Sequence, residues 1–211
     1  MRSSRIRVIV VEDDSRLLDC LKMEISRSPS LRWAGGFYRF ETAAEQIPNK
    51  EPDVILLDLG LPGMDGIEAI RVIKDKWPRL KIVVFSGCNE EEAIYSAFMA
   101  GANGFLVKST PRQELVEGIE TAYAGGAPMS PDVNKTLVAF FAARRMLAPH
   151  LSPTEKAILS EYDRGTPQKQ IAAKMGMSEQ TLYTHRNRIL EKTGVNSLLR
   201  AAWLMRQAER V

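Results

Sequence analysis

Polar side chains follow four apolar runs of the sequence, at the points where strands are expected to end. They are Glu12, Asp13 and Asp14 after 6–11, Asp58 after 54–57, Ser86 after 82–85, and Lys108 after 104–107. In an open parallel α/β sheet, ligands bind outside the carboxyl ends of the strands. One edge of such a sheet would therefore collect carboxylates, a hydroxyl and an ammonium. This set is suited to a phosphoryl group bound together with a divalent cation.

Asp58 is the predicted nucleophile, because a carboxylate can accept a phosphoryl group as a mixed anhydride. Such a transfer depends mainly on neutralising charge. We expect Asp13 to coordinate Mg²⁺ directly and Glu12 to hold a metal-bound water, with the Gly60 carbonyl and Asp58 as further ligands. Asp14 lies at the mouth of the first helix. It is therefore expected to be a helix cap rather than a ligand.

Lys108 and Ser86 would complete this site. The lysine is expected to pair with the acids and then with the phosphoryl oxygens. Alternatively, Lys108 could form an ordinary surface salt bridge. A single lysine at the end of an apolar strand that leads to an acidic edge favours the role in the site. The Ser86 hydroxyl would donate to a phosphoryl oxygen. Alternatively, a serine before Gly87 is a turn residue.

The first 125 residues alternate short apolar runs with helical patterns. The expected strands are 6–11, about 31–37, 54–58, 81–85 and 104–108, and the expected helices are about 15–27, 41–48, 66–77, 90–100 and 111–124. Several strand runs are apolar without alternation, as in strands that are covered on both faces. Alternation of strands and helices implies right-handed βαβ units and a doubly wound five-stranded parallel sheet. The second strand contains two glycines and is expected at an edge.

The remainder of the chain has only helical patterns. Gly125-Gly126-Ala127-Pro128 breaks the alternation, and Ser130-Pro131-Asp132 is typical of a helix start. We expect a linker helix from there through Arg145, closed by residues 148–150. Four further helices are expected at 152–163, 168–175, 179–193 and 197–207.

A turn signal separates the helices expected at 168–175 and 179–193. Gly176-Met177-Ser178 forms a short turn, and Ser178 is a good cap for the helix after it. A helix, a turn with glycine and a second helix follow the helix-turn-helix pattern, although many helical bundles share it. On the helix expected at 179–193, Leu182, Ile189 and Leu190 fall on the apolar stripe. The last helix carries apolar residues on one side, either as a pairing surface or as packing within its own domain; these are Leu198, Ala201, Ala202 and Met205.

Charge is distributed unevenly along the 211 residues. The formal net charge of +3 divides into −3 for residues 1–128 and +6 for residues 129–211. A small basic half suggests contact with a polyanion, although basic helical surfaces are often only solvated. No apolar stretch approaches the ~20 residues that span a bilayer, and the expected location is the cytoplasm. Cys20 and Cys88 lack metal-ligand spacing and are expected to be free thiols.

Residues 6 to about 125 resemble a two-component receiver domain, and the strand-end residues named above carry this resemblance. Residues 151–207 resemble the LuxR-type helix-turn-helix of the NarL/FixJ response regulators, through Ile171-Ala-x-x-Met-Gly-Met-Ser178 and Lys192-Thr-Gly-Val195. The resemblance implies a flavodoxin-like receiver at 1–125, a linker at 126–150 and an all-α DNA-binding domain at 151–211. It further implies Mg²⁺ as cofactor, a sensor histidine kinase that phosphorylates Asp58, and a homodimer that binds double-stranded DNA when phosphorylated.

The same resemblance implies roles for further residues. Phe105 corresponds to an aromatic that turns inward when the Ser/Thr moves toward the phosphate. Receivers often carry Pro after the lysine and Tyr as the aromatic, whereas this chain has Ser109 and Phe. Tyr183, Thr184 and Asn187 correspond to base-reading positions. The residues expected to contact DNA phosphates are Lys169, Arg186, Arg188 and Lys192. Arg186 occupies a position that is commonly apolar, so it could bind phosphate instead of packing inward.

Two other functions compete with a phosphorylation-activated regulator. A phosphatase of the haloacid dehalogenase type also uses an aspartyl nucleophile, but it needs a second Asp two residues later, where this chain has Gly60. A regulator that acts without phosphorylation is the other alternative. The complete set of Glu12, Asp13, Asp58, Ser86 and Lys108 argues against a degenerate site.

Overall fold

A computed structural model describes residues 5–88, 90–147, 151–195 and 197–209. The chain divides into two compact units, the first ending at Leu137 and the second beginning at Val138. The predicted linker, 126–150, therefore has residues in both units, and its predicted end at 148–150 lies outside the described residues.

The first unit is built on a five-stranded parallel sheet. Its strands are β1 (Ile6–Val11), β2 (Leu31–Phe37), β3 (Val54–Leu57), β4 (Lys81–Ser86) and β5 (Gly104–Val107). They lie in the order β2-β1-β3-β4-β5, and every pairing is parallel. The strand predictions are confirmed, including the edge position of the second strand. All four residues of β3 are buried, as its unbroken apolar run predicts.

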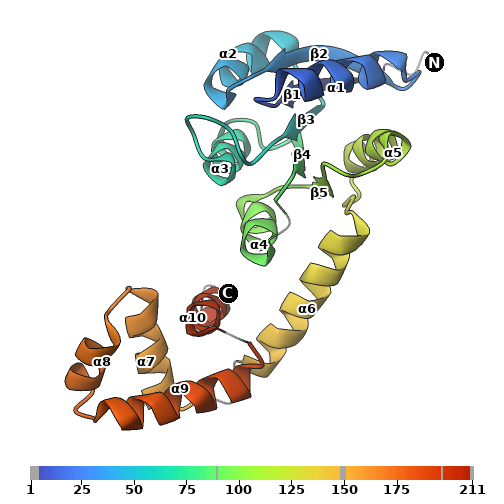
Figure 1. Cartoon of the computed structure of the whole chain (residues 1–211). Coiled ribbons are helices and arrows are strands. Elements are labelled where there is room, and N and C mark those ends of the chain that lie inside the picture. The colour runs from blue at the N-terminus through green and yellow to red at the C-terminus, as the bar shows by residue number, and fades with distance from the viewer. Residues whose placement is uncertain (1–4, 89, 148–150, 196, 210–211) are drawn as a thin grey trace. The chain divides into compact units, whose positions relative to one another are not determined.

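Helices cover both faces of this sheet (Figure 1). They are α1 (Ser15–Arg27), α2 (Phe40–Lys50), α3 (Gly66–Lys76), α4 (Glu91–Ala100) and α5 (Arg112–Tyr123). Ile9 and Val11 of β1 join the core beneath α2, α3 and α4, whereas Val8 and Val10 join the core beneath α1 and α5. Successive side chains of a strand point to opposite faces, so β1 contributes to both cores. The predicted doubly wound fold is confirmed.

A segment after α5 runs alongside β5 at the open edge of the sheet. The Phe105 amide donates to the Pro128 carbonyl at 2.9 Å, and the Ser130 amide donates to the Phe105 carbonyl at 3.2 Å. A Cβ on Gly104 would lie 2.5 Å from the Pro128 side chain and 2.7 Å from its carbonyl oxygen. This close approach therefore requires glycine at position 104. Helix α6 (Pro131–Leu147) follows at once, as the Ser-Pro-Asp signal predicts.

The second unit contains α7 (Pro153–Asp163), α8 (Gln168–Lys174), α9 (Glu179–Thr193) and α10 (Leu198–Glu209). Ser178 caps α9 by accepting a hydrogen bond from the Thr181 amide, and Gly194 ends the helix in the left-handed region at φ 65°. The predicted helix-turn-helix is thus formed by α8 and α9 (Figure 1). The apolar residues of α10 named above are buried, and α10 packs on α7 and α9. They accordingly serve packing within their own domain.

The described part of the chain holds no helix that is both long enough and apolar enough to cross a membrane. Cys20 and Cys88 are half-buried free thiols, as expected.

Candidate functional site

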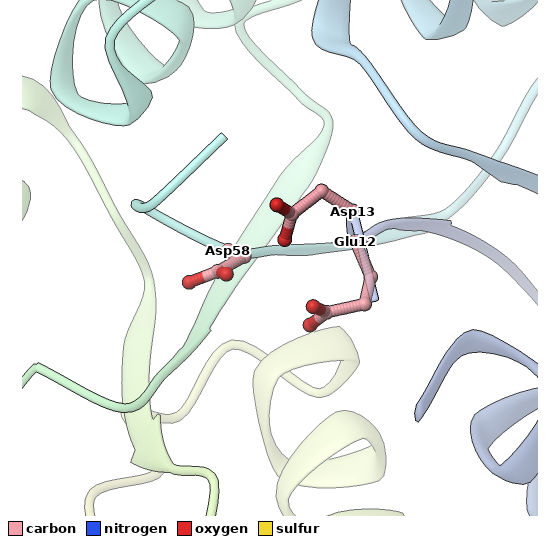
Figure 2. Close-up of side chains that lie close together, drawn as sticks. All are labelled: Glu12, Asp13 and Asp58. Atoms are coloured by element: carbon pink, nitrogen blue, oxygen red, sulfur yellow. The ribbon is translucent and has the colours of Figure 1, made fainter. Parts of the chain in front are cut away.

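Three carboxylates gather at the carboxyl ends of β1 and β3. Glu12 and Asp13 follow β1 and Asp58 follows β3, and Figure 2 shows the three side chains side by side. One oxygen of each carboxylate lies within 4.8 Å of the others. Glu12 is 1% exposed and Asp58 5% exposed, whereas Asp13 is exposed. The structure therefore brings together the acidic cluster that the strand ends predict.

Backbone hydrogen bonds fix these residues at the strand ends. The Glu12 amide donates to the Phe37 carbonyl at 2.9 Å, and the Asp58 amide donates to the Val11 carbonyl at 3.0 Å. The sheet ladder thus continues one residue beyond β1 and β3. The site is consequently held by the backbone of the sheet rather than by free loops.

Lys108 places its ammonium between two of the acids. Its Nζ donates to Glu12 Oε1 and to Asp58 Oδ2, each at 2.8 Å. Burial lowers the pKa of Lys108, but the hydrogen bonds to Asp58 and Glu12 outweigh that effect and leave the pKa above its ordinary value. The lysine therefore lies inside the cluster as a cation paired with the acids, as predicted, and not in a surface salt bridge.

Glu12 remains under electrostatic strain in spite of Lys108. Burial raises the pKa of its carboxyl group, and hydrogen bonds from Lys108 and the Asp14 amide offset this only in part. A second cation beside the cluster would stabilise the ionised form. Carboxylate oxygens are the ligands that Mg²⁺ prefers, and a Cβ on Gly60 would lie 3.6 Å from Asp58 Oδ2, so this backbone also passes close by. The donor set fits a divalent cation.

Asp14 has the separate role that the sequence predicts for it. Its Oδ1 accepts from the Arg16 and Leu17 amides at 2.8 and 3.2 Å, which makes it the cap of α1. It is therefore a helix cap and lies outside the group of possible metal ligands.

Ser86 ends β4, the strand next to β3, and Phe105 lies on β5, the strand beyond it. Ser86 is buried at the end of β4, where its Oγ accepts from the Cys88 amide at 3.3 Å. The Lys108 amide donates to the Ser86 carbonyl at 2.9 Å, so the two residues are neighbours across β4 and β5. Phe105 is fully buried beneath α4. Its side chain therefore belongs to the core of the first unit.

In the second unit, α9 presents a polar face. Tyr183, Thr184, Asn187 and Arg188 are exposed there, while Leu182 and Ile189 are buried. Lys169 on α8 is exposed as well. The residues expected to read bases therefore share the free side of one helix.

Lys192 has a partner that the sequence prediction missed. Its Nζ donates to both carboxylate oxygens of Glu155, at 2.9 and 2.8 Å, and so joins α9 to the start of α7. Glu155 also accepts from the Ser152 amide, as half of a capping box. Burial alone would raise the pKa of the Glu155 carboxyl group, but these hydrogen bonds outweigh burial and lower that pKa. The Ser-x-x-Glu spacing at 152–155 is the signal that could have identified the cap.

Arg186 differs from the other basic residues predicted to contact DNA. Its side chain is half-buried, and its guanidinium carbon lies 5.9 Å from the centre of the Tyr183 ring. The Arg186 Nε atom is buried. The structure therefore directs part of this side chain toward the interior of the unit.

Family models agree with both halves of the molecule. Residues 8–120 match the response regulator receiver domain, and residues 149–205 match the luxR family of bacterial regulatory proteins. The chain is 32% identical over 199 residues to the nitrate/nitrite response regulator protein NarL of Escherichia coli K12, covering 92% of each chain. It is 30% identical over 193 residues to the transcriptional regulatory protein MctR of Rhizobium johnstonii, covering 92% of this chain and 89% of the relative.

Solved structures show the same fold. RcsB from Salmonella enterica serovar Typhimurium bound to promoter rprA matches with a TM-score of 0.74 at 22% identity, over 94% of this chain and 98% of that one. A LuxR-family two-component response regulator from Aurantimonas sp. SI85-9A1 matches with a TM-score of 0.62 at 31% identity, over 66% and 99%.

A receiver with a carboxylate cluster and a lysine, followed by a LuxR-type helix-turn-helix, is the architecture of a DNA-binding response regulator. The chain belongs to the NarL/FixJ family of these regulators.

Proposed function

We propose that this protein is a cytoplasmic transcription regulator that a sensor histidine kinase activates by phosphorylating Asp58. The observation that carries the proposal is the position of the Lys108 ammonium, 2.8 Å from both Asp58 and Glu12. In the transfer, an Asp58 carboxylate oxygen forms a bond to phosphorus while the bond from phosphorus to the kinase imidazole nitrogen breaks. The chain is then a stoichiometric phosphoacceptor, since Gly60 offers no acid or base for turnover.

Each residue of the cluster has a defined part in this proposal. Glu12, Asp13, Asp58 and the Gly60 carbonyl would hold Mg²⁺, which supplies charge neutralisation for the phosphoryl oxygens. Lys108 would move from its carboxylate partners to a phosphoryl oxygen, and the Ser86 hydroxyl would donate to another. Both groups are within reach because they end neighbouring strands.

The coupling to the rest of the chain is proposed to run through β5. This strand carries Phe105 and leads directly into Lys108, and it pairs with the segment from Pro128 to Ser130 that begins α6. A shift of Lys108 and Phe105 after phosphorylation would therefore alter the backbone that anchors α6. We propose that this change promotes dimerisation and operator binding by differential stabilisation of the active state.

The DNA-binding part of the proposal rests on α9 and on charge. Residues 129–211 have a net charge of +6, and α9 exposes Tyr183 and Asn187 one helical turn apart. We propose that α9 enters the major groove with Tyr183, Thr184 and Asn187 facing the bases. The residues proposed to contact phosphates are Lys169, Arg186, Arg188 and Lys192.

The deciding experiment is incubation with acetyl phosphate and Mg²⁺, followed by electrophoresis that retards phosphoproteins. We expect the wild-type chain and the exposed control Asp75→Asn to shift, and Asp58→Asn to show no shift. Removal of Mg²⁺ by a chelator should abolish the shift. A phosphate that is acid-labile and still forms on Asp58→Asn at the wild-type rate would refute the assignment. Sustained hydrolysis of a small phosphate ester would instead favour a phosphatase.

A further inference from the structure

A cavity of about 790 Å³ lies in the first unit, at the amino ends of β1, β3 and β4. Its lining includes Arg7 of β1, Asp53 just before β3 and Lys81, the first residue of β4. The acidic cluster stands at the carboxyl ends of the strands, so the cavity lies at the opposite edge of the sheet. Pockets for small organic ligands commonly measure about 300–1,000 Å³. The cavity is therefore large enough for an organic molecule.

Two aromatic residues line this cavity, one from each helical layer. Trp77 ends α3, is half-buried and packs against the core beneath α2, α3 and α4. Tyr123 is the last residue of α5 and is 48% exposed. Aromatic side chains of this kind pack well against a flat ring. The other uncharged residues of the lining are all apolar, namely Ile47, Pro48, Pro52, Pro78 and Leu80.

The wall that carries Trp77 is a hydrogen-bonded turn. The Leu80 amide donates to the Trp77 carbonyl at 3.0 Å, and the Trp77 amide donates to the Ile73 carbonyl at 2.7 Å. Pro78 stands at the second position of this four-residue turn, where the fixed φ of proline is favourable. The backbone at Trp77 and Arg79 is therefore held in place without a ligand.

A second wall is held by Arg7. Its Nε donates to Asp53 Oδ2 at 3.2 Å, and its Nη1 donates to Glu51 Oε2 at 3.1 Å. Glu51 has a φ of 42°, and among the described residues it is the one non-glycine residue with a positive φ. Such strain persists where the surrounding contacts hold it. Arg7 thus engages both carboxylates of the lining and fixes this wall as well.

Two further cations of the lining lack such partners. The side chains of Arg79 and Lys81 form no ion pair with a carboxylate within the ranges that the structure describes. Burial lowers the pKa of Lys74, and the nearby positive charge of Lys81 lowers it further. An anion beside Arg79 and Lys81 would relieve this repulsion. The cavity consequently combines aromatic walls with unpaired positive charge.

We propose that this cavity binds a small organic anion that carries a flat ring. The ring packs against Trp77 and Tyr123, and the anionic group pairs with Arg79 and Lys81. The anionic group is either a phosphate monoester, as in a nucleotide, or a carboxylate, as in an aromatic acid. None of these four residues takes part in the phosphorylation or the DNA contacts proposed above.

The test is a titration of the full chain with adenosine monophosphate and, separately, with indoleacetate. A chelator is present so that the acidic cluster holds no metal. The indole N–H signal of Trp77 is followed by nuclear magnetic resonance and is identified as the signal lost in Trp77→Phe. We expect a saturable shift, and the probe that binds more tightly identifies the anionic group. Adenosine and inorganic phosphate, or indole and acetate, should each bind more weakly than the intact probe.

Variants of the two cations test where the anionic group binds. Arg79→Gln and Lys81→Gln should each weaken binding by roughly threefold, because ion pairs that are partly exposed to solvent are weak. Arg71→Gln changes an exposed arginine of α3 outside the lining and should leave the affinity unchanged.

A variant of the exposed tyrosine tests where the ring binds. Tyr123→Ala should weaken binding by about fivefold or more, the usual effect of removing an aromatic residue that stacks on a base. Tyr38→Ala is the matched control, because Tyr38 is 55% exposed and lies outside the lining.

The absence of a saturable Trp77 shift with both probes would overturn the inference. An equal affinity for inorganic phosphate or acetate alone would also overturn it, because the ring would then contribute nothing. None of these measurements depends on phosphorylation of Asp58. Failure of the acetyl phosphate experiment would therefore refute the proposed function while leaving this site intact, and the reverse also holds.

Discussion

At the scale of single residues, Glu12 is the group in which burial and charge conflict most directly. Its pKa is raised by burial even though Lys108 donates to it. A raised pKa means that the folded protein binds the proton more tightly than the unfolded chain does. The contribution of Glu12 to stability is therefore full below the ordinary glutamate pKa and is lost as the pH rises through the raised value.

We expect Glu12→Gln to raise the Tm at pH 7.5 in the absence of Mg²⁺, because glutamine removes the buried negative charge. The gain should shrink as the pH falls toward about 4.3, where the wild-type carboxyl group is itself protonated. Thermal denaturation at several pH values measures the effect, and the exposed Glu45→Gln controls for the loss of one charge. A glutamine variant that melts below the wild type at neutral pH would contradict this account of Glu12.

Asn187 is exposed on α9, and we expect it to read a base. An asparagine side chain can pair bidentately with adenine, so Asn187→Ala should cost roughly 1–3 kcal/mol on the true operator and little on random DNA. Arg188→Ala, on the same exposed face, should weaken binding to both DNAs about equally. Affinities on operator and random duplexes give the comparison. Equal losses on both for Asn187→Ala would show that this side chain does not read bases.

The sequence predicted the positions and contacts of the receiver residues better than those of the helix-turn-helix residues. Asp58 and Lys108 could be located because strand ends in a parallel sheet meet at one edge. The Lys192–Glu155 ion pair could not, because a lysine on an amphipathic helix has the same pattern whether it faces solvent or a buried acid. Arg186 was ambiguous for a similar reason, since its place on the apolar stripe does not say where a long side chain ends.

At the scale of elements, the segment from Pro128 to Ser130 is held to β5 by a side chain as well as by backbone. Ser130 is 4% exposed, and its Oγ accepts from the Val107 amide at 3.0 Å. This hydroxyl also bonds to Thr110 Oγ1 at 2.8 Å. One residue thus ties the start of α6 to the strand that leads into Lys108.

We expect Ser130→Ala to weaken this attachment by about 1–3 kcal/mol, because it leaves a partly buried amide without an acceptor. The Val107 amide should then exchange its hydrogen faster than in the wild type, and coupling between phosphorylation and DNA binding should fall. Asn134→Ala, an exposed change on α6, is the control. Unchanged exchange at Val107 would show that the hydroxyl does not hold the segment.

The sequence predicted the strands and helices of the chain because their apolar patterns are local. The pairing of Pro128 with Phe105 has no such pattern, since it joins residues that are distant in sequence through backbone atoms alone. Gly104 was a weak signal of it, because a strand glycine often marks a close approach of another backbone.

At the scale of the whole molecule, we expect phosphorylation to shift a monomer–dimer equilibrium toward the dimer. Sedimentation of the wild type at tens of micromolar, with and without beryllofluoride and Mg²⁺, measures this shift. Asp58→Asn should sediment identically under both conditions. A wild-type chain that stays monomeric with beryllofluoride would contradict the prediction. Because Leu198, Ala201, Ala202 and Met205 of α10 are buried in their own unit, the pairing surface must be formed by other residues.

The strand-like pairing of residues 128–130 also affects how the receiver behaves when it is separated from the rest of the chain. An uncovered edge strand offers free amide and carbonyl groups to other chains and promotes aggregation. A receiver fragment that ends at Gly125 would expose the outer edge of β5 in this way. A fragment that continues to Leu137 retains the covering segment, and it is the fragment that should remain soluble as a single species.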